Sequence, residues 1–252
     1  MNLDDYLAFA IQTAIDAGKI ALAHYQTGVA VELKPDRSPV TLADRGAEQA
    51  IRQAIAARYP EHSVVGEEYG ADERSSPFRW VVDPIDGTKS FVRGVPLFGT
   101  LIGLEIDGRV EVGVCHLPAL DETVAAATGL GCTWNGRTAR VSDTRTLEEA
   151  TVLLSDGRML GERLGDRRHV FERVTGLMRT WGDCYGYTLV ATGRADVMID
   201  PAMNPWDCAA LVPILREAGG RFTDWTGVER IDGGDAVGTN SALHEAVLDL
   251  LR

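Results

Sequence analysis

Two carboxylates stand three residues apart in the stretch 80-WVVDPIDGTKSFVRG-94. The apolar run Trp80–Val82 is typical of a strand, and Asp83 and Asp86 follow it. Pro84 between them fixes the backbone and has no N–H group to satisfy. Such a turn can direct both carboxylates and the Ile85 carbonyl at one point. Oxygen ligands of this kind are the ones that Mg²⁺ takes in proteins.

The next two residues could form an anion-binding turn beside this acid pair. Gly87 allows a close approach of the backbone, and the amides of Gly87 and Thr88 can bind an anion, more so if they open a helix. An acid pair that binds metal beside such a turn suits a phosphate ester, attacked at phosphorus by a water molecule that the metal activates. Taken alone, an Asp-Pro-x-Asp-Gly string is more often a solvated turn, so both interpretations stay open at this point.

Two further stretches place acids in comparable positions. The short apolar run in 64-VVGEE-68 ends in Glu67 and Glu68, and Asp207 in 204-NPWDCAAL-211 opens a predicted helix. Alone, the first is typical of a surface charge pair and the second of a helix cap. Strand ends and helix starts that each carry an acid are what a shared metal cluster needs.

Length and charge limit the classes of protein to consider. The 252 residues suffice for one large domain or two small ones. The net charge of -12 and the absence of a basic stripe argue against a nucleic-acid partner. The acid excess favours solubility, and part of it fits a cation site. No apolar run reaches the roughly 18 residues of a membrane span.

The cysteines and the first residues point to a compartment. The four cysteines are scattered and form neither a disulfide framework nor a Cys-x-x-Cys metal site; they are Cys115, Cys132, Cys184 and Cys208. The acidic start, Met1–Asp5, lacks the basic residues that begin a signal peptide. We therefore expect reduced thiols in a cytoplasmic protein.

The elements that must position the acids fall into two halves. In the first half, apolar spacing predicts helices at 4–26 and 43–59, and strands at 29–33, 63–66, 79–82, 100–105, 110–115, 121–128 and 131–134. Residues 34–39 read as a turn-rich loop. Asp107-Gly108 and Asn135-Gly136 are hairpin signals. This half, residues 1–145, is expected to be an α+β subdomain with an antiparallel sheet, two flanking helices and most metal ligands.

The second half, residues 146–252, alternates strands with helices. Its predicted strands are 152–154, 196–199, 221–223 and 237–239, and its predicted helices are 162–179, 185–192, 205–217 and 241–251. Gly219-Gly220 is a helix stop. The alternation predicts an α/β subdomain with a parallel sheet that completes the site. With no long linker between them, the two halves should pack tightly.

The combination of motifs resembles the Mg²⁺-dependent, lithium-sensitive inositol monophosphatase family. The resemblance rests on 66-GEE-68, 83-DPIDGT-88 and 206-WD-207, and extends to 41-TLAD-44 and 192-TGRAD-196. It covers nearly the whole chain. It implies a five-layer αβαβα sugar-phosphatase fold, two to three Mg²⁺ ions per site, inhibition by Li⁺ and a homodimer.

The resemblance also implies roles for the matching residues. The implied metal ligands are Glu67, Asp83, the Ile85 carbonyl, Asp86 and Asp207. The pair that activates the water is Asp44 with the Thr88 hydroxyl, and Glu67 is a third catalytic residue. The implied substrate-binding set is Glu67, Ile85, Asp86, Gly87, Thr88, Asp183, Asp200 and Asp207. Lys34 falls in a basic loop near the site, with a looser alignment.

Four stretches look like the bacterial histidinol-phosphatase branch of this family: 88-TKSFVRGVPLFGTLIGL-104, 115-CHLPALDET-123, 182-GDCYGY-187 and 200-DPAMNPWD-207. L-Histidinol phosphate has a cationic leaving group, so its pocket should offer carboxylates beyond the metal ligands. Asp183 and Asp200 are the candidates, although either could be a helix cap instead. Tyr185 and Tyr187 could stack on the imidazole or pack in the core.

Other functions remain as alternatives. Inositol 1-phosphate is the second substrate, and 3′-phosphoadenosine 5′-phosphate, which would want basic residues such as Lys89, Arg93 and Arg194, is the third. A fructose-1,6-bisphosphatase would usually be longer. A non-catalytic Mg²⁺-binding protein would be favoured if Asp44 or Thr88 were missing, and both are present. The five histidines are dispersed, which favours attack by water over a covalent phosphoenzyme.

Overall fold

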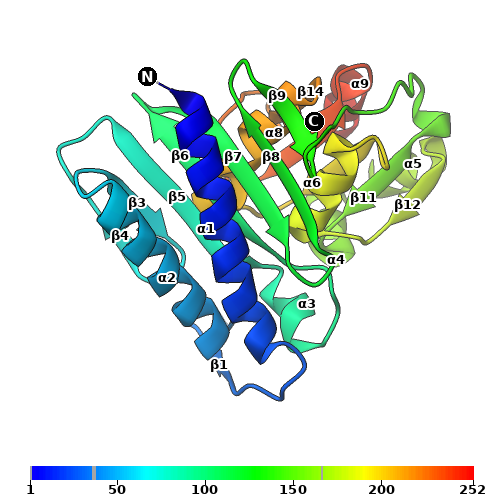
Figure 1. Cartoon of the computed structure of the whole chain (residues 1–252). Helices are drawn as coiled ribbons and strands as arrows, with labels where there is room; N and C mark the ends of the chain where they lie inside the picture. The colour runs from blue at the N-terminus through cyan, green and yellow to red at the C-terminus, as the bar shows by residue number, and fades with distance from the viewer. Residues whose placement is uncertain (1, 36–37, 166) are drawn as a thin grey trace.

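The computed structural model describes residues 2–35, 38–165 and 167–252, so two residues of the predicted loop at 34–39 lie outside it. Its elements form five layers (Figure 1). Two long helices cover an eight-stranded sheet, three shorter helices lie behind that sheet, a five-stranded sheet follows, and a last group of helices closes the far side. The predicted αβαβα architecture is confirmed.

The first layer consists of α1 (Leu3–His24) and α2 (Leu42–Arg58). Alanines at helical spacing on α1, among them Ala10, Ala14 and Ala17, let the two helices approach the sheet closely. Ile51 and Ile55 of α2 join the same buried cluster. Both helices were predicted within two residues of their ends, because their apolar residues recur every three to four positions.

The first sheet has the strand order β10-β9-β8-β7-β6-β5-β3-β4. Its strands are β3 (Ser63–Gly66), β4 (Gly70–Asp72), β5 (Phe78–Asp86), β6 (Gly99–Ile106), β7 (Arg109–Leu117), β8 (Glu122–Ala127), β9 (Gly131–Trp134) and β10 (Arg137–Thr138). Neighbouring strands are antiparallel except for β3 and β5. A separate hairpin pairs β1 (Val31–Leu33) with β2 (Pro39–Thr41).

Strand β5 differs from the prediction in a way that matters for the site. It was expected to end before Asp83, but it continues to Asp86. Its register against β6 shifts between Asp83 and Asp86, which is a bulge. Pro84 explains the irregularity, since it cannot donate to the ladder, while its carbonyl accepts a hydrogen bond from Thr100 Oγ1 at 2.9 Å.

The second sheet has the order β12-β11-β13-β15-β14. Its strands are β11 (Thr151–Leu154), β12 (Leu177–Arg179), β13 (Val197–Asp200), β14 (Gly220–Thr223) and β15 (Ala236–Asn240). The expected parallel pairing holds for β11 with β12 and β13, but β15 is antiparallel to both β13 and β14. The prediction failed there because a loop, not a helix, joins β14 to β15.

Two predicted helices of the second half are divided. Residues 162–179 form the end of α4 (Gly157–Leu164), then α5 (Arg167–Val174) and then β12, with Gly165 at a φ of 54° closing α4. Residues 205–217 form α7 (Pro205–Ala209) and α8 (Leu211–Glu217). Pro213 lacks the N–H that would continue one helix across this junction. The remaining helices are α3 (Thr88–Val92), α6 (Asp183–Ala191), α9 (His244–Leu251) and the 3₁₀ turn Leu147–Glu149.

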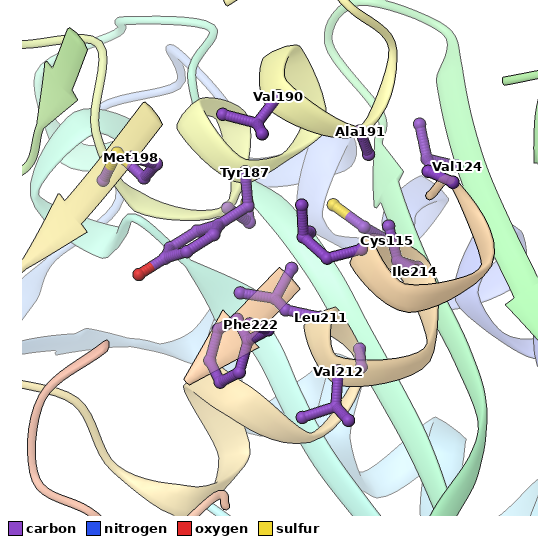
Figure 2. Close-up of a cluster of buried hydrophobic side chains, with 14 of the residues drawn as sticks. Cys115, Val124, Tyr187, Val190, Ala191, Met198, Leu211, Val212, Ile214 and Phe222 are labelled. Carbon is purple, nitrogen blue, oxygen red and sulfur yellow. The ribbon is translucent and has the colours of Figure 1, made fainter. Parts of the chain in front are cut away.

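The middle layer joins the two halves into one core. Helices α6, α7 and α8 come from the second half, and their apolar side chains pack with β6, β7 and β8 of the first (Figure 2). Glycines make this contact close: a Cβ at Gly113 would lie 2.0 Å from the Ala210 carbonyl oxygen, and one at Gly103 would lie 2.8 Å from the Ala209 Cβ. The seating of α7 against the first sheet therefore depends on two positions without side chains.

Among the helices that the structure describes, none combines the length and the apolar character that crossing a bilayer requires.

Candidate active site

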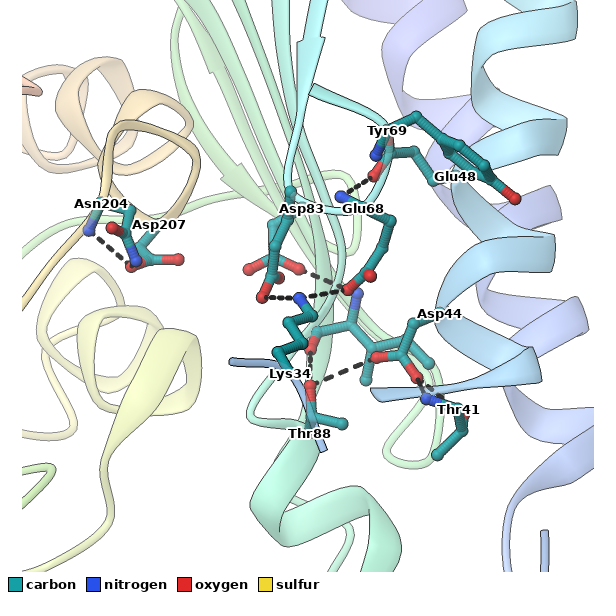
Figure 3. Close-up of polar contacts among 12 residues, drawn as sticks. Lys34, Thr41, Asp44, Glu48, Glu68, Tyr69, Asp83, Thr88, Asn204 and Asp207 are labelled. Atoms are coloured by element: carbon teal, nitrogen blue, oxygen red, sulfur yellow. Dashed lines mark hydrogen bonds and ion pairs between the residues drawn. The ribbon is translucent and has the colours of Figure 1, made fainter. Parts of the chain in front are cut away.

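Three carboxylates from two different layers converge at one end of the first sheet. Asp83 extends from β5 and Asp207 extends from α7 (Figure 3), and Asp86 is the last residue of β5. One oxygen from each lies within 4.8 Å of the others. The sequence separates Asp207 from the pair by more than a hundred positions, so the packing of α7 against β5 and β6 brings the cluster together.

Glu67 joins this cluster from the neighbouring strand. It follows β3, whose Gly66 lies beside Val82 in a parallel pair, and this register places Glu67 next to Asp83. Lys34 Nζ donates to one oxygen of Glu67 and one of Glu68, both at 2.7 Å. Burial alone would lower the pKa of Lys34, but the two hydrogen bonds outweigh it and raise that pKa. The lysine therefore stays charged and holds both glutamates.

Electrostatics identify the cluster as an unsatisfied anionic site. Burial first, and then the carboxylates of Glu67, Asp86 and Asp207, raise the pKa of Asp83 well above its usual value. Burial and then the neighbouring Asp183 and Asp207 do the same for the pKa of Asp86. Burial raises the pKa of Asp207 to about 6. Like charges this close and this buried repel one another unless something positive lies between them.

The donor set fits a hard divalent cation. In the described part of the chain, no basic side chain forms an ion pair with Asp83, Asp86 or Asp207. Ile85, whose carbonyl oxygen lies 3.0 Å from Thr88 Oγ1, lines the same cavity as these carboxylates. A set made of carboxylate and carbonyl oxygens, without sulfur or imidazole, is typical of Mg²⁺ sites.

A second pair lies beside the cluster. Thr88 Oγ1 lies 3.2 Å from Asp44 Oδ1 and 3.0 Å from the Ile85 carbonyl oxygen. The other oxygen of Asp44 accepts from the amide and the hydroxyl of Thr41, at 2.7 and 2.6 Å. This capping box fixes the start of α2 and the Asp44 rotamer together. The two residues that the resemblance pairs are thus in contact.

The turn that follows the acids has the geometry of an anion cradle. Gly87 has a φ of 86° and is the N-cap of α3. A Cβ there would lie 2.8 Å from the Leu97 carbonyl oxygen and 3.2 Å from Asp183 Oδ2, so the position accepts only glycine. Gly87 and Thr88 line the same cavity as the acids.

Asp207 occupies a different helical position from the one expected. It is the third residue of α7, and Asn204 is the N-cap. Asp207 Oδ2 accepts from the Asn204 amide at 2.7 Å (Figure 3). The capping explanation is therefore partly right, because one oxygen caps the helix while the other is available to the cluster.

Two adjoining cavities lie over these residues. The first, of about 160 Å³, is lined by Ser38, Pro39, Glu67, Asp83, Ile85, Asp86, Gly87, Thr88, Lys89, Asp183, Asn204 and Asp207. The second, of about 310 Å³, is lined by Lys89, Ser90, Val95, Leu97, Ser155, Asp156, Thr180, Gly182, Asp183, Asp200 and Ala202. Asp183 and Lys89 belong to both linings, so the two spaces are neighbours.

The two candidate selectors therefore face the second cavity. Asp183 is the first residue of α6, has a φ of 56°, and follows the N-cap Gly182. Asp200 ends β13, so it is not a helix cap, and Ser155 Oγ donates to its Oδ1 at 2.5 Å. Both side chains are acids without a basic partner bonded to them in the described part of the chain.

Sequence reasoning missed three residues around the site. Lys89, considered only for a more anionic substrate, lines both cavities. Ser155 follows β11 and holds Asp200, and a polar residue directly after a strand was its available signal. The buried Glu48 accepts from the amides of Glu68 and Tyr69 at 2.7 and 3.2 Å, which shapes the loop that carries Glu67. A glutamate inside an amphipathic helix gave no such signal.

Comparisons with known proteins agree with this geometry. The model of the inositol monophosphatase family matches residues 2–252. A histidinol-phosphatase of Chlorobaculum parvum is 42% identical, over 94% of this chain and 93% of its own. A histidinol-phosphatase of Mycobacterium tuberculosis is 39% identical, over 100% and 99%. The solved Thermotoga maritima IMPase superposes with a TM-score of 0.90 at 31% identity, covering 98% of this chain and 96% of that one. This chain therefore belongs to the inositol monophosphatase family.

Proposed function

We propose that this protein is a Mg²⁺-dependent histidinol-phosphatase, which hydrolyses L-histidinol phosphate to L-histidinol and phosphate in histidine biosynthesis. The observation that supports this choice of substrate is the second cavity, which is lined by Asp183 and Asp200 and adjoins an already acidic site. A leaving group with a cationic amine can form an ion pair with these carboxylates, which a neutral or anionic leaving group cannot form. Identities of 42% and 39% to two histidinol-phosphatases support the same choice.

The residues that would hold two to three Mg²⁺ ions are Glu67, Asp83, the Ile85 carbonyl, Asp86 and Asp207. Bound ions would neutralise the phosphate oxygens and make a water molecule more acidic. The carboxylates keep that charge next to the anion-binding turn of Gly87 and Thr88. Lys34 keeps Glu67 in place through its 2.7 Å hydrogen bond.

Asp44 and Thr88 are proposed to take the proton of the attacking water. The Thr88 hydroxyl donates to Asp44 at 3.2 Å, which leaves the lone pairs of Oγ1 free to accept from water. Asp44 is buried, and burial raises its pKa, so this carboxylate is a stronger base than an exposed aspartate. Glu67 would act as the third catalytic residue, next to Asp83.

Asp183 and Asp200 are proposed to bind the alcohol. The phosphate would occupy the smaller cavity over the acid cluster, and the amine and imidazole would extend into the larger one. Ser155 fixes one oxygen of Asp200, so that its carboxylate has a defined direction. Discrimination would come from amine hydrogen bonds, because an analogue without the amine leaves buried acids unpaired.

Phosphate release tests the proposal most directly. L-Histidinol phosphate, inositol 1-phosphate and 3′-phosphoadenosine 5′-phosphate would be compared with Mg²⁺ and with EDTA. We expect a Mg²⁺-dependent preference for L-histidinol phosphate, reduced at least about tenfold in D200N. A preference for inositol 1-phosphate would keep the chemistry and replace the substrate; the family and the T. maritima IMPase make it the second candidate. No release from any of the three would favour a non-catalytic Mg²⁺-binding protein.

We also propose that the protein is cytoplasmic and forms a homodimer. All four cysteines are free and buried, which suits the reducing cytoplasm. The homodimer is proposed from the family resemblance, and light scattering at micromolar protein would test it. Li⁺ inhibition of phosphate release would be measured in the same assay.

A further inference from the structure

The hydroxyl of Tyr187 is an unexplained buried polar group. Tyr187 is 0% exposed, and its hydroxyl has no hydrogen-bond partner among the residues that the structure describes. An unpaired buried hydroxyl opposes folding, and phenylalanine would fill the same volume without that penalty. The group therefore calls for a partner that the apolar core does not supply.

Packing fixes the direction of this hydroxyl. The ring lies against Phe222, with centroids 5.6 Å apart. On the Gly238 side, an added Cβ would come within 2.8 Å of Cδ1 of the ring, so Gly238 leaves room for it. Figure 2 shows the oxygen pointing away from the labelled apolar side chains. The ring cannot turn without losing this packing.

The strand register places Asp200 on the same face as the ring. Met198 pairs with Gly238, and Asp200 pairs with Ala236, so all four residues share one face of the second sheet. Met198 packs with Tyr187 in the inner cluster, whereas its neighbour Ile199 faces the outer one. Asp200 therefore projects into the layer that holds Tyr187, two residues from Met198 or about 6.6 Å along the strand.

The electrostatic surroundings indicate the end of the strand toward which the hydroxyl points. Burial raises the pKa of Tyr187, and the groups that raise it further are Asp200, Cys208, Asp86 and Asp207, in that order. The strongest of these is the proposed selector, and two others belong to the acid cluster. The phenol thus lies behind the site, on the protein side of Asp200.

We propose that Tyr187 is a positioning residue for substrate selection: its hydroxyl donates, through one bridging water, to the Asp200 carboxylate and fixes the face that meets the amine. Ser155 Oγ donates to Oδ1 of Asp200 and the Ala202 backbone N–H also donates to this carboxylate, so the bridging water adds a further donor on the side of Tyr187. This inference rests on the proposed role of Asp200. It assigns the tyrosine to specificity, not to the hydrolytic step.

The kinetic test compares Y187F with wild type, and with Y59F as a matched control, since Tyr59 lies in a separate aromatic cluster. With Mg²⁺ present, we expect Y187F to raise KM for L-histidinol phosphate about tenfold with kcat within about twofold. Hydrolysis of p-nitrophenyl phosphate, which has no amine, should be unchanged in Y187F, and Y59F should change neither substrate. Y187F added to D200N should have no further effect. Unchanged selectivity together with a raised Tm would overturn the proposal.

A second readout needs no substrate and separates this inference from the proposed function. Thermal unfolding of wild type, Y187F, D200N and the double variant gives a coupling between the two side chains. A clear coupling supports the contact even if wild type shows no preference for L-histidinol phosphate, a result that would count against the proposed function alone. Additive changes in Tm would overturn the contact whatever the preferred substrate.

Discussion

At the scale of single residues, Asp83 is the most crowded of the acids. Four other carboxylates raise its pKa after burial does: Glu67, Asp86, Asp207 and Asp44. Acidic neighbours on this scale suit a ligand shared between bound cations. Replacing the Asp83 carboxylate should therefore abolish metal-dependent activity without weakening the folded protein.

For D83N we expect phosphate release at saturating Mg²⁺ to fall at least about 100-fold, because the site loses the carboxylate at its centre. The metal-free protein should unfold at an equal or higher temperature than wild type, since one repulsive charge is gone. D249N, an exposed change on α9, is the matched control. Retained turnover in D83N would contradict the ligand assignment.

Thr88 and Asp44 should behave as one unit. T88A removes the 3.2 Å contact with Asp44, and we expect kcat to fall about 10- to 100-fold with little change in KM. D44N should have a similar effect, and the double variant should lose no more than the worse single one. Steady-state kinetics on all three would show this. Multiplying losses would mean that the residues act separately.

The residues of the acid cluster could be predicted from the sequence, whereas the residues that surround and hold the cluster could not. Acids at strand ends could be read from the motifs, and the pairing of Asp44 with Thr88 came from the resemblance. Glu48 could not be found, since its contacts reach twenty positions along the chain to the amides after Glu67. The contact between Ser155 and Asp200 spans 45 positions. Contacts at such separations depend on the packed fold and leave no local pattern.

At the scale of elements, the junction between α7 and α8 positions Asp207. The two helices pack on β6 and β7, and Gly113 is in the closest contact, since a Cβ there would lie 2.0 Å from a backbone oxygen. Backbone cannot move aside as a flexible side chain can. Any side chain at this position must push the helices away from the first sheet.

We therefore expect G113A to lower the free energy of unfolding by about 2 kcal/mol or more. It should also weaken Mg²⁺ activation, because Asp207 moves with its helix. G46A is the matched control: its Cβ would lie 3.5 Å from Ile20, an ordinary contact at a half-buried position of α2, so stability should be unchanged or slightly higher. Urea unfolding and Mg²⁺ titration would measure both. A stable, fully active G113A would show that α7 is not held this way.

Element boundaries show what local sequence can and cannot predict. The hairpin at Asp107-Gly108 was predicted from the Asp-Gly pair, and in the structure both residues have the positive φ that a two-residue turn requires, 51° and 78°. Pro213 was the signal that α7 and α8 are separate, and the apolar periodicity across it concealed the break. The strand β12 was missed because it is short, largely exposed and at the edge of its sheet, so its sequence lacks a clear alternation of apolar and polar residues.

At the scale of the whole molecule, we propose that residues 1–145 and 146–252 are two subdomains that share one core. The first sheet uses strands from residues 63–138, and the second uses strands from residues 151–240. One apolar cluster contains Val81 and Leu101 from the first half together with Tyr187 and Leu211 from the second. A shared cluster of this kind predicts a single unfolding transition.

The far side of the molecule contains a pH-sensitive contact. His244 at the start of α9 is 0% exposed and lies between Thr239 and Thr223, with its ring nitrogens 2.9 and 3.2 Å from their hydroxyls. Burial, then Arg221, lowers the pKa of His244 to about 4. The folded protein thus binds this proton less readily than the unfolded chain, whose histidine has a pKa of 6.5.

The stabilisation from this neutral histidine is complete above pH 6.5 and decreases as the pH falls toward 4. At pH 5 we expect a loss of about 2 kcal/mol in the free energy of unfolding relative to pH 7.5. Urea unfolding at several pH values, with H244N alongside, would measure it. H244N should show a shallower pH dependence, and parallel curves for the two proteins would exclude His244 as the cause.

The convergence of Asp207 with Asp83 and Asp86 has a consequence for how the enzyme is made. During synthesis, the ribosome releases the first sheet with its two aspartates well before α7 exists, so the nascent chain carries an incomplete cluster. A cation would bind such a half-site weakly, and hydrolysis would not begin. Under the proposed ligand assignment, catalysis starts only after the second half has docked, and a truncated or stalled product has no phosphatase activity even when its first half has folded.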